Sequence, residues 1–158
     1  MKCPPLFRPV SAGVRLALLI LGLGLTGCEY DVPLTKEPTR GVDDRLTGDW
    51  IAKDGWMKVR PLDANGYVVF FDGKLYRAWH STVAGLALVT VQDIETGNRK
   101  YSYLGYAVSD DGRRLTLRVV NDKLIPDETA DSARVQKLFE QYARDPALFT
   151  GDVVYVKQ

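Results

Sequence analysis

Aromatic and arginine side chains in the middle of the chain could together bind a small ligand. Arg77 and Trp79 are two residues apart in one predicted strand, so they share a face of it. Tyr101 and Tyr103 alternate in the same way in a later strand, and the predicted register places them near Arg118. Rings beside an arginine could form a pocket for a small amphipathic or anionic molecule. The alternative is ordinary cross-strand packing, with the arginine stems lying over the rings.

Residues that could support catalysis or bind a metal are few and scattered. His80 is the only histidine, so no second histidine stands at the spacing of a zinc site. None of the serines lies in the Gly-x-Ser-x-Gly sequence of a hydrolase. The aspartate pairs Asp43-Asp44 and Asp110-Asp111 do not continue into a calcium-binding loop. We therefore predict that the protein is not an enzyme and holds neither a metal nor a cofactor.

The first residues have the layout of a secretory signal. A basic start, an apolar run and two small residues precede a cysteine: Lys2, Arg8 and Arg15, then 16–25, then Thr26 and Gly27. The apolar stretch is shorter than the roughly 20 residues that cross a bilayer, so an uncleaved span is not expected. The tetrapeptide Leu25-Thr26-Gly27-Cys28 resembles the lipobox of bacterial lipoproteins.

This resemblance implies a cellular location and a covalent modification. In that family residues before the cysteine are removed, which here makes 1–27 the signal peptide and Cys28 the acylated first residue. Two or more acyl chains hold a protein to a membrane almost permanently. An aspartate directly after the cysteine tends to retain Gram-negative members in the inner membrane, and this chain has Glu29 there. The resemblance therefore favours the outer membrane, facing the periplasm, over the inner membrane.

Composition sets limits on the mature chain. The full sequence has 158 residues, and the part that remains after the signal suits one domain. Without the three basic residues of the signal, 18 basic and 20 acidic residues remain, and this net charge of −2 gives no sign of nucleic-acid binding. The only cysteines are Cys3 and Cys28, so the folded domain contains no disulfide.

The predicted organisation has two parts. Residues 28–44 contain Pro33, Pro38 and Gly41 and show no apolar period, so we predict a lipidated N-terminus followed by a flexible tether. Residues 45–158 form a single β-rich globular domain.

Short β-type runs separated by turn residues dominate this domain. The predicted strands cover 48–53, 56–62, 67–71, 74–82, 86–94, 99–109, 113–121 and 152–157. Asp72-Gly73 and Asp111-Gly112 indicate tight hairpins, whose turns fix the register. Val108 should then oppose Leu115, and Phe70 should oppose Leu75. Both faces of the hairpin around Asp72-Gly73 are largely apolar, so it needs cover on both sides.

A single helix near the C-terminus could provide that cover. Its apolar residues fall on helical spacing: Val135, Leu138, Phe139 and Tyr142. Thr129 is the predicted N-cap, and Asp145-Pro146 ends the helix. The expected fold is mainly β, a small antiparallel meander barrel or strongly curved sheet of about eight strands with this C-terminal helix packed on it.

Gly48-Asp49-Trp50, at the head of the first strand, resembles the Gly-x-Trp signature that opens lipocalins. The late helix followed by a short strand is also similar to their layout. In that family the tryptophan packs at the closed end of the barrel beneath an arginine from a late strand. The resemblance therefore gives Trp50 the tryptophan role and makes Arg118 the candidate arginine.

Taken together, these features predict a membrane-anchored bacterial lipoprotein that acts as a non-enzymatic binding or envelope-maintenance module. Its partners would be the membrane, through the acyl chains on Cys28, and a small amphipathic ligand or an envelope protein, but no nucleic acid. The alternative is a structural accessory subunit of a larger cell-envelope complex. A hollow barrel interior would favour carriage of a ligand, and a filled one would favour docking.

Overall fold

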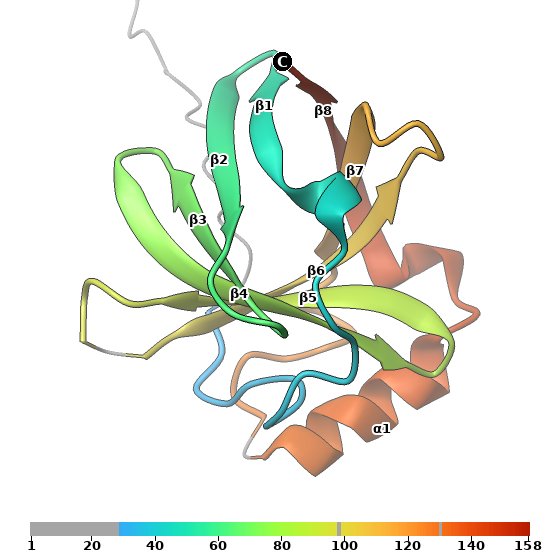
Figure 1. Cartoon of the computed structure of the whole chain (residues 1–158). Helices are drawn as coiled ribbons and strands as arrows, with labels where there is room; N and C mark the ends of the chain where they lie inside the picture. The colour runs from blue at the N-terminus through green and yellow to red at the C-terminus, as the bar shows by residue number, and fades with distance from the viewer. Residues whose placement is uncertain (1–28, 98, 130) are drawn as a thin grey trace, which may run out of the picture.

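Eight antiparallel strands, each paired with the next along the chain, close into a barrel (Figure 1). The computed structural model describes residues 29–97, 99–129 and 131–158. The strands are β1 (Gly48–Ala52), β2 (Gly55–Pro61), β3 (Tyr67–Phe71), β4 (Lys74–Val83), β5 (Leu86–Asp93), β6 (Tyr101–Val108), β7 (Arg114–Val120) and β8 (Phe149–Lys157). One α-helix, α1 (Ser132–Tyr142), and two short 3-10 turns, η1 (Asp44–Leu46) and η2 (Pro146–Leu148), complete the described fold. The predicted β-barrel with one C-terminal helix is confirmed.

The predicted hairpin registers are also confirmed. Phe70 pairs with Leu75 across the turn between β3 and β4, and Val108 pairs with Leu115 between β6 and β7. Asp72 and Gly73 both have positive φ, 50° and 77°, as a tight hairpin turn of the primed type needs. Turn chemistry thus sets which side chains of these strands point into the barrel.

One apolar core fills part of the barrel interior. Its buried residues are Leu46, Trp50, Met57, Val59, Tyr67, Ala78, Leu104, Leu115, Leu117 and Tyr155. Trp50 is fully buried, and its indole Nε1 donates to the carbonyl of Leu46 at 2.9 Å. This hydrogen bond satisfies the one polar group of a large buried ring.

The cation over Trp50 is Lys157, not Arg118. The Nζ of Lys157 lies 4.9 Å from the centre of the Trp50 ring and donates to the carbonyl of Arg45 at 2.8 Å. Arg118 points to the outside, where its Nε is 3.5 Å from Asp152 and its guanidinium lies over Phe149. The expectation for Arg118 is therefore wrong, because the pleat of β7 places it on the outer face, opposite Gly105.

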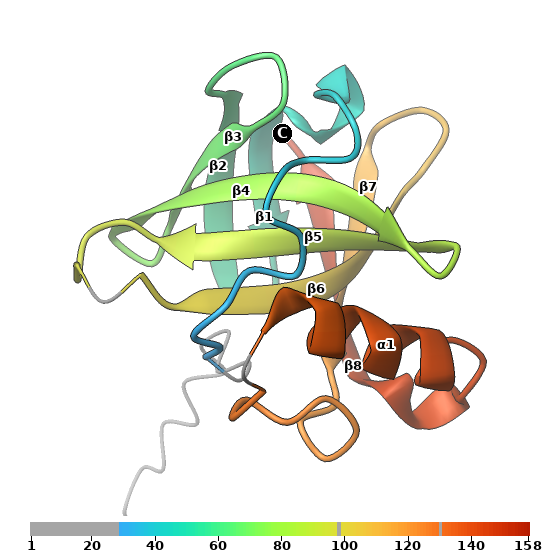
Figure 2. The ribbon, with the colours of Figure 1, turned by 90° about the horizontal axis from the view of Figure 1, so that it is seen from below.

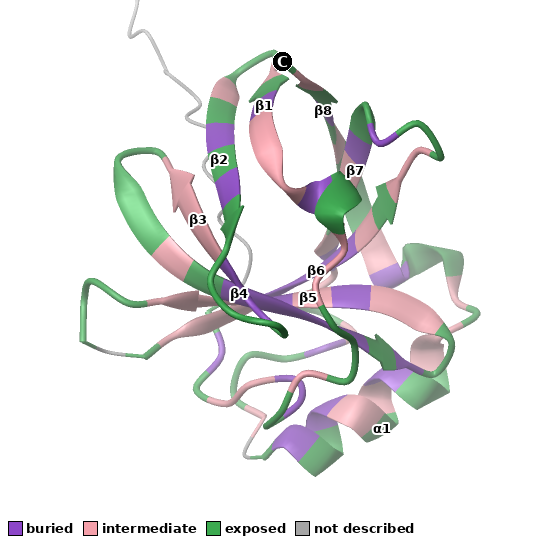
Figure 3. Ribbon diagram, in the orientation of Figure 1, coloured by how far each residue is buried: buried purple, intermediate pink, exposed green. Residues whose placement is uncertain are grey.

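A second apolar core lies outside the barrel wall, beneath α1 and the N-terminal segment (Figure 2). It is made of Tyr30, Leu34, Val83, Leu88, Tyr103, Val120, Ile125, Val135, Phe139 and Leu148. Four consecutive residues of β4, Ala78 to Ser81, are buried, because this strand faces a core on each side (Figure 3). The predicted cover by the helix is thus confirmed for this part of β4.

Residues 30–43 do not form the flexible tether that the sequence predicts. Tyr30 and Leu34 are buried, with 1% and 0% of their surface exposed. Tyr30 extends the sheet by two backbone hydrogen bonds with Tyr101, of 2.7 and 2.9 Å. The hydroxyl of Thr35 lies 2.6 Å from that of Ser81. Isolated apolar residues without a period give no sequence signal, because the groove that receives them forms only in the folded barrel.

The N-cap of the helix lies two residues after the predicted one. Asp131 is the N-cap of α1, and its carboxylate accepts from the backbone N–H of Arg134 at 2.8 Å. Thr129 instead donates its hydroxyl to the carbonyl of Pro126 at 2.6 Å. Aspartate caps a helix at least as well as threonine, so the position at which the helix begins decides which of the two residues is the N-cap.

Gly105 of β6 has no room for a side chain. A Cβ there would lie 2.7 Å from Cε1 of Phe149 and 3.2 Å from Cβ of Arg118. We expect Gly105→Ala to lower the free energy of unfolding by about 1–3 kcal/mol, the usual effect of overpacking, as urea denaturation would measure. Gly151→Ala is the matched control, because nothing lies within 4 Å of a Cβ built there. An equal loss of stability in both variants would contradict this packing.

Candidate functional site

The barrel interior contains a cavity of about 120 Å³. Strands β2 to β7 line it with inward-facing side chains that are mostly apolar, among them Val59, Val69, Ala78, Val89, Val91 and Leu104. Alanine and valine at these facing positions leave the space unfilled, whereas Trp50 and its neighbours fill another part of the interior. A cavity with such a lining is suited to an apolar guest.

A polar cluster of His80, Tyr67 and Tyr106 lies on the wall of this cavity. His80 Nδ1 is 2.7 Å from the hydroxyl of Tyr106, and its Nε2 contacts the carbonyl of Gly41. Because a carbonyl can only accept, Nε2 carries the proton and Nδ1 accepts from Tyr106. Arg40 in turn donates from Nη1 to the Tyr106 hydroxyl at 3.1 Å. The cluster thus joins the barrel wall to the segment around Gly41.

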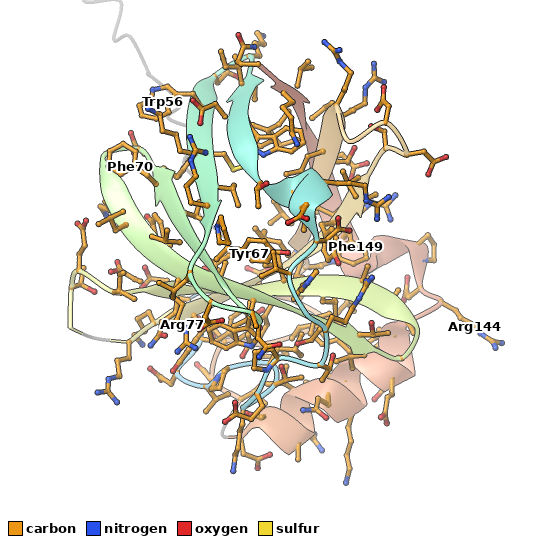
Figure 4. All side chains as sticks on the ribbon, in the orientation of Figure 1. Trp56, Tyr67, Phe70, Arg77, Arg144 and Phe149 are labelled. Carbon is orange, nitrogen blue, oxygen red and sulfur yellow. The ribbon has the colours of Figure 1, made fainter. Side chains whose placement is uncertain are left out.

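Tyr67 joins the same segment from β3. Its hydroxyl accepts from the backbone N–H of Asp43 at 2.6 Å and lies 3.4 Å from His80 Nε2. Figure 4 shows Tyr67 in the middle of the barrel, beside the chain that leads into β1. The histidine and the two tyrosines therefore fasten residues 40–43 against the cavity.

These groups stay neutral near pH 7. Burial lowers the pKa of His80, and the positive charge of Arg40 acts in the same direction, while the Gly41 carbonyl and Asp43 oppose it. Burial also raises the pKa of Tyr67 and of Tyr106. None of the described residues that line the cavity is an aspartate, glutamate, lysine or arginine. The site therefore offers an uncharged wall to a guest.

The depressed pKa of His80 predicts how stability depends on pH. The unfolded chain, whose histidine has a pKa of about 6.5, binds a proton before the folded chain does as pH falls. We therefore expect the free energy of unfolding to decrease as pH falls below about 6.5 and to level off below the folded-state pKa. His80→Gln should lack this step. Urea unfolding midpoints between pH 8 and pH 4.5 would measure it, and an identical slope in the variant would contradict the assignment.

The five binding residues predicted from the sequence do not line the cavity. Arg77, Trp79 and Tyr101 do lie together: the Arg77 guanidinium is 5.5 Å from the centre of the Trp79 ring, which meets Tyr101 edge-on at 6.2 Å. Tyr103 is buried, stacked on Tyr30 at 4.0 Å. Arg118 lies apart from them with Phe149. The alternative of an arginine stem packed over a ring describes Arg77 and Trp79.

The alternation of side chains along each strand explains why the binding residues predicted from the sequence are not the ones that line the cavity. Trp79 and Tyr103 point outward, so their neighbours Ala78, His80 and Leu104 point into the cavity. The inward positions that line the cavity include the small residues Ala78, Val89 and Val91, with one histidine among them. A lone histidine in a β-strand gives no reason on its own to expect a cavity beside it.

Two further features of the described residues bear on function. No three histidine, cysteine, aspartate or glutamate side chains in 29–97, 99–129 and 131–158 are placed to hold a metal ion together. The helices of the same residues include none of the length and apolar character needed to cross a bilayer.

Comparison with known protein families, curated proteins and solved structures finds no match to this chain. The assignment of the site therefore depends on its geometry and on the motifs of the sequence.

Proposed function

We propose that this chain is a membrane-anchored bacterial lipoprotein whose barrel binds a small, mainly apolar molecule without transforming it. The observation that carries the proposal is the cavity of about 120 Å³ with its uncharged, largely apolar lining. Cavities of about 150 Å³ with an apolar lining bind molecules the size of benzene. A single ring or a short alkyl chain is the class of guest that fits.

The polar cluster supports binding over catalysis. Both ring nitrogens of His80 are occupied, one by the Gly41 carbonyl and the other by Tyr106. A general base needs a nitrogen within hydrogen-bond reach of the reacting group. With its nitrogens used to fasten residues 40–43, His80 acts as a structural part of the cavity wall.

The anchor in this proposal is the lipid on Cys28, which lies outside the described residues. Support for it comes from the resemblance of residues 25–28 to a lipobox and from the basic and apolar run before them. Glu29 after the cysteine favours the outer membrane, facing the periplasm. A binding barrel held there would take up apolar molecules that are sparingly soluble in water.

A series of straight-chain primary alcohols tests the ligand class. Titration into the chain from Cys28 to Gln158, followed by NMR, should show affinity rising by about 0.8 kcal/mol for each added methylene until the cavity is full. Beyond that length the gain should stop, because additional carbons find no space. Affinity that rises without a limit, as for adsorption to a surface, or the absence of binding at any length, would contradict the proposal.

A further inference from the structure

The turns of the barrel divide between its two ends. In an antiparallel meander, alternate turns lie at the same end. The hairpin turns at 53–54, 72–73 and 94–100 therefore share one end, which we call the turn end, and those at 62–66, 84–85 and 109–113 lie at the other. The longer connection 121–148, which contains α1, also starts from the turn end. In Figure 1 the three hairpin turns of this end follow one another from the top of the molecule down its left side.

Exposed apolar side chains gather next to the turn end. We call them the apolar rim: Ile51, Trp56, Phe70, Leu75 and Ile94. Four of them are 39% to 48% exposed, and Phe70 is partly buried. None of them lines the cavity, and α1 covers a different part of the wall (Figure 2). Figure 4 shows Trp56 and Phe70 near each other at the outside of the barrel.

The rim is continuous across neighbouring strands. Ile51 pairs with Trp56 across the first turn. Val156 pairs with Ile51 on the other side, but it also pairs with Arg114, beside the turn at 109–113, so it is not part of the rim. The ring of Trp56 lies 5.4 Å from that of Phe70, which pairs with Leu75. A continuous exposed apolar surface of this kind marks a place of contact with a partner or a membrane. Its residues Phe70 and Leu75 belong to the part of the β3–β4 hairpin that the helix leaves without cover.

The N-terminal segment begins at this same end. Tyr30 pairs with Tyr101, the first residue of β6, directly after the turn at 94–100. Asp31 is fixed there as well, with its carboxylate 2.5 Å from the Nζ of Lys100. Cys28 is two residues before Tyr30, so covalent geometry keeps the two α-carbons within about 7 Å of each other. A lipid on Cys28 would thus leave almost no slack between the bilayer and the turn end.

Charges at the turn end favour an apolar contact over an electrostatic one. The three hairpin turns and the strand residues directly beside them carry both signs in equal numbers: Lys53, Lys74, Arg99 and Lys100 against Asp54, Asp72, Asp93 and Glu95. Trp56 has Lys58 over its ring at 5.6 Å, an arrangement with an apolar body and a charged edge. Tryptophan prefers the boundary between headgroups and acyl chains.

We infer that the bilayer surface covers the apolar rim, so that the barrel stands on the membrane by its turn end. This inference rests on the proposed acylation of Cys28, because that anchor brings the rim within reach of lipid. The contact buries Trp56 and its neighbours among the headgroups. It does not depend on the charge of the lipid, since the three hairpin turns and the residues beside them carry no excess of either sign.

A chemically attached lipid tests the contact without relying on acylation in cells. Cys28 is the only thiol between residues 28 and 158, a stretch that holds both cores and all eight strands. It can therefore be coupled to a maleimide-headgroup lipid in phosphatidylcholine vesicles that contain brominated phosphatidylcholine. Trp50 and Trp79 are 0% and 5% exposed and Trp56 is 46% exposed, so bromine quenching reports on Trp56. We expect quenching that is unchanged by high salt or by added phosphatidylglycerol.

Paired variants separate the rim from the rest of the surface. Leu75→Asp combined with Ile94→Asp should abolish most of the quenching. Leu62→Asp, at the opposite end and 53% exposed, should leave it unchanged. Unquenched Trp56 in the coupled wild-type protein, or equal quenching in all variants, would overturn the inference. So would an unquenched Trp56 accompanied by crosslinking between two copies, which would assign the rim to a second molecule. Failure of acylation in cells would count against the proposed function and leave this result intact.

Discussion

Replacing Cys28 by serine abolishes incorporation of radiolabelled palmitate and moves the protein from the membrane fraction to the soluble fraction. This is the expected result in cells that express the full chain, and it is the largest effect that the proposal predicts. Acyl chains bind membranes through about 0.8 kcal/mol for each buried methylene, so two or more chains make dissociation negligible. Without the sulfur there is no thioether, and the apolar rim alone must hold the domain.

The other cysteine supplies the control for this prediction. Cys3 precedes the apolar run and should be removed with the signal, so Cys3→Ser should label and fractionate like the wild-type protein. Palmitate incorporation that persists in Cys28→Ser, or that is lost in Cys3→Ser, would show that the lipid is elsewhere. Mass spectrometry of the mature N-terminus would identify the modified residue directly.

Ala78→Leu should weaken binding of the best-fitting alcohol by more than tenfold. Ala78 is buried at the cavity wall, so the three added carbons would occupy space that the guest needs. At about 0.8 kcal/mol for each methylene displaced, the loss amounts to about 2 kcal/mol. The free energy of unfolding should stay the same or rise, because the new side chain fills a void. NMR titration and urea denaturation would measure the two effects.

Ala107→Leu makes the same chemical change on the outside of the barrel. Ala107 is exposed on β6 opposite Thr116, away from the cavity. The affinity of the Ala107→Leu variant for the alcohol should equal that of the wild-type chain. If the two variants lose affinity equally, the guest does not bind in the interior.

The sequence predicts the barrel well because the information for it is local. Asp72-Gly73 and Asp111-Gly112 specify tight turns, and alternation of apolar residues then specifies which face points inward. The pairs Phe70 with Leu75 and Val108 with Leu115 follow from those two facts and agree with the structure. No long-range information is needed until the last strand pairs with the first.

What the sequence does not predict depends on contacts between distant segments. Tyr30 and Leu34 show no period, yet they are buried against β6 and α1 because those elements create a groove. The cation over Trp50 comes from Lys157, which meets the first strand only through closure of the barrel. Neither contact leaves a pattern in neighbouring residues.

The candidate site is hidden from sequence analysis for a related reason. A cavity is the difference between the space that the strands enclose and the volume of the side chains that enter it. Val89 and Val91 read as ordinary strand residues, and only the closed barrel shows that the residues facing them are too small to fill the space. The polar wall is equally non-local, since His80 and Gly41 are far apart in the chain.

The most direct test of an apolar guest in the barrel is a set of intermolecular NOEs between 1-hexanol and the methyl groups of the protein. We predict NOEs from the alkyl chain to Val89 and Val91, whose side chains line the cavity, and none to Val154, which is exposed on the outer wall. NOEs confined to Val154 and other exposed methyls, or none at saturating 1-hexanol, would contradict the proposed binding function.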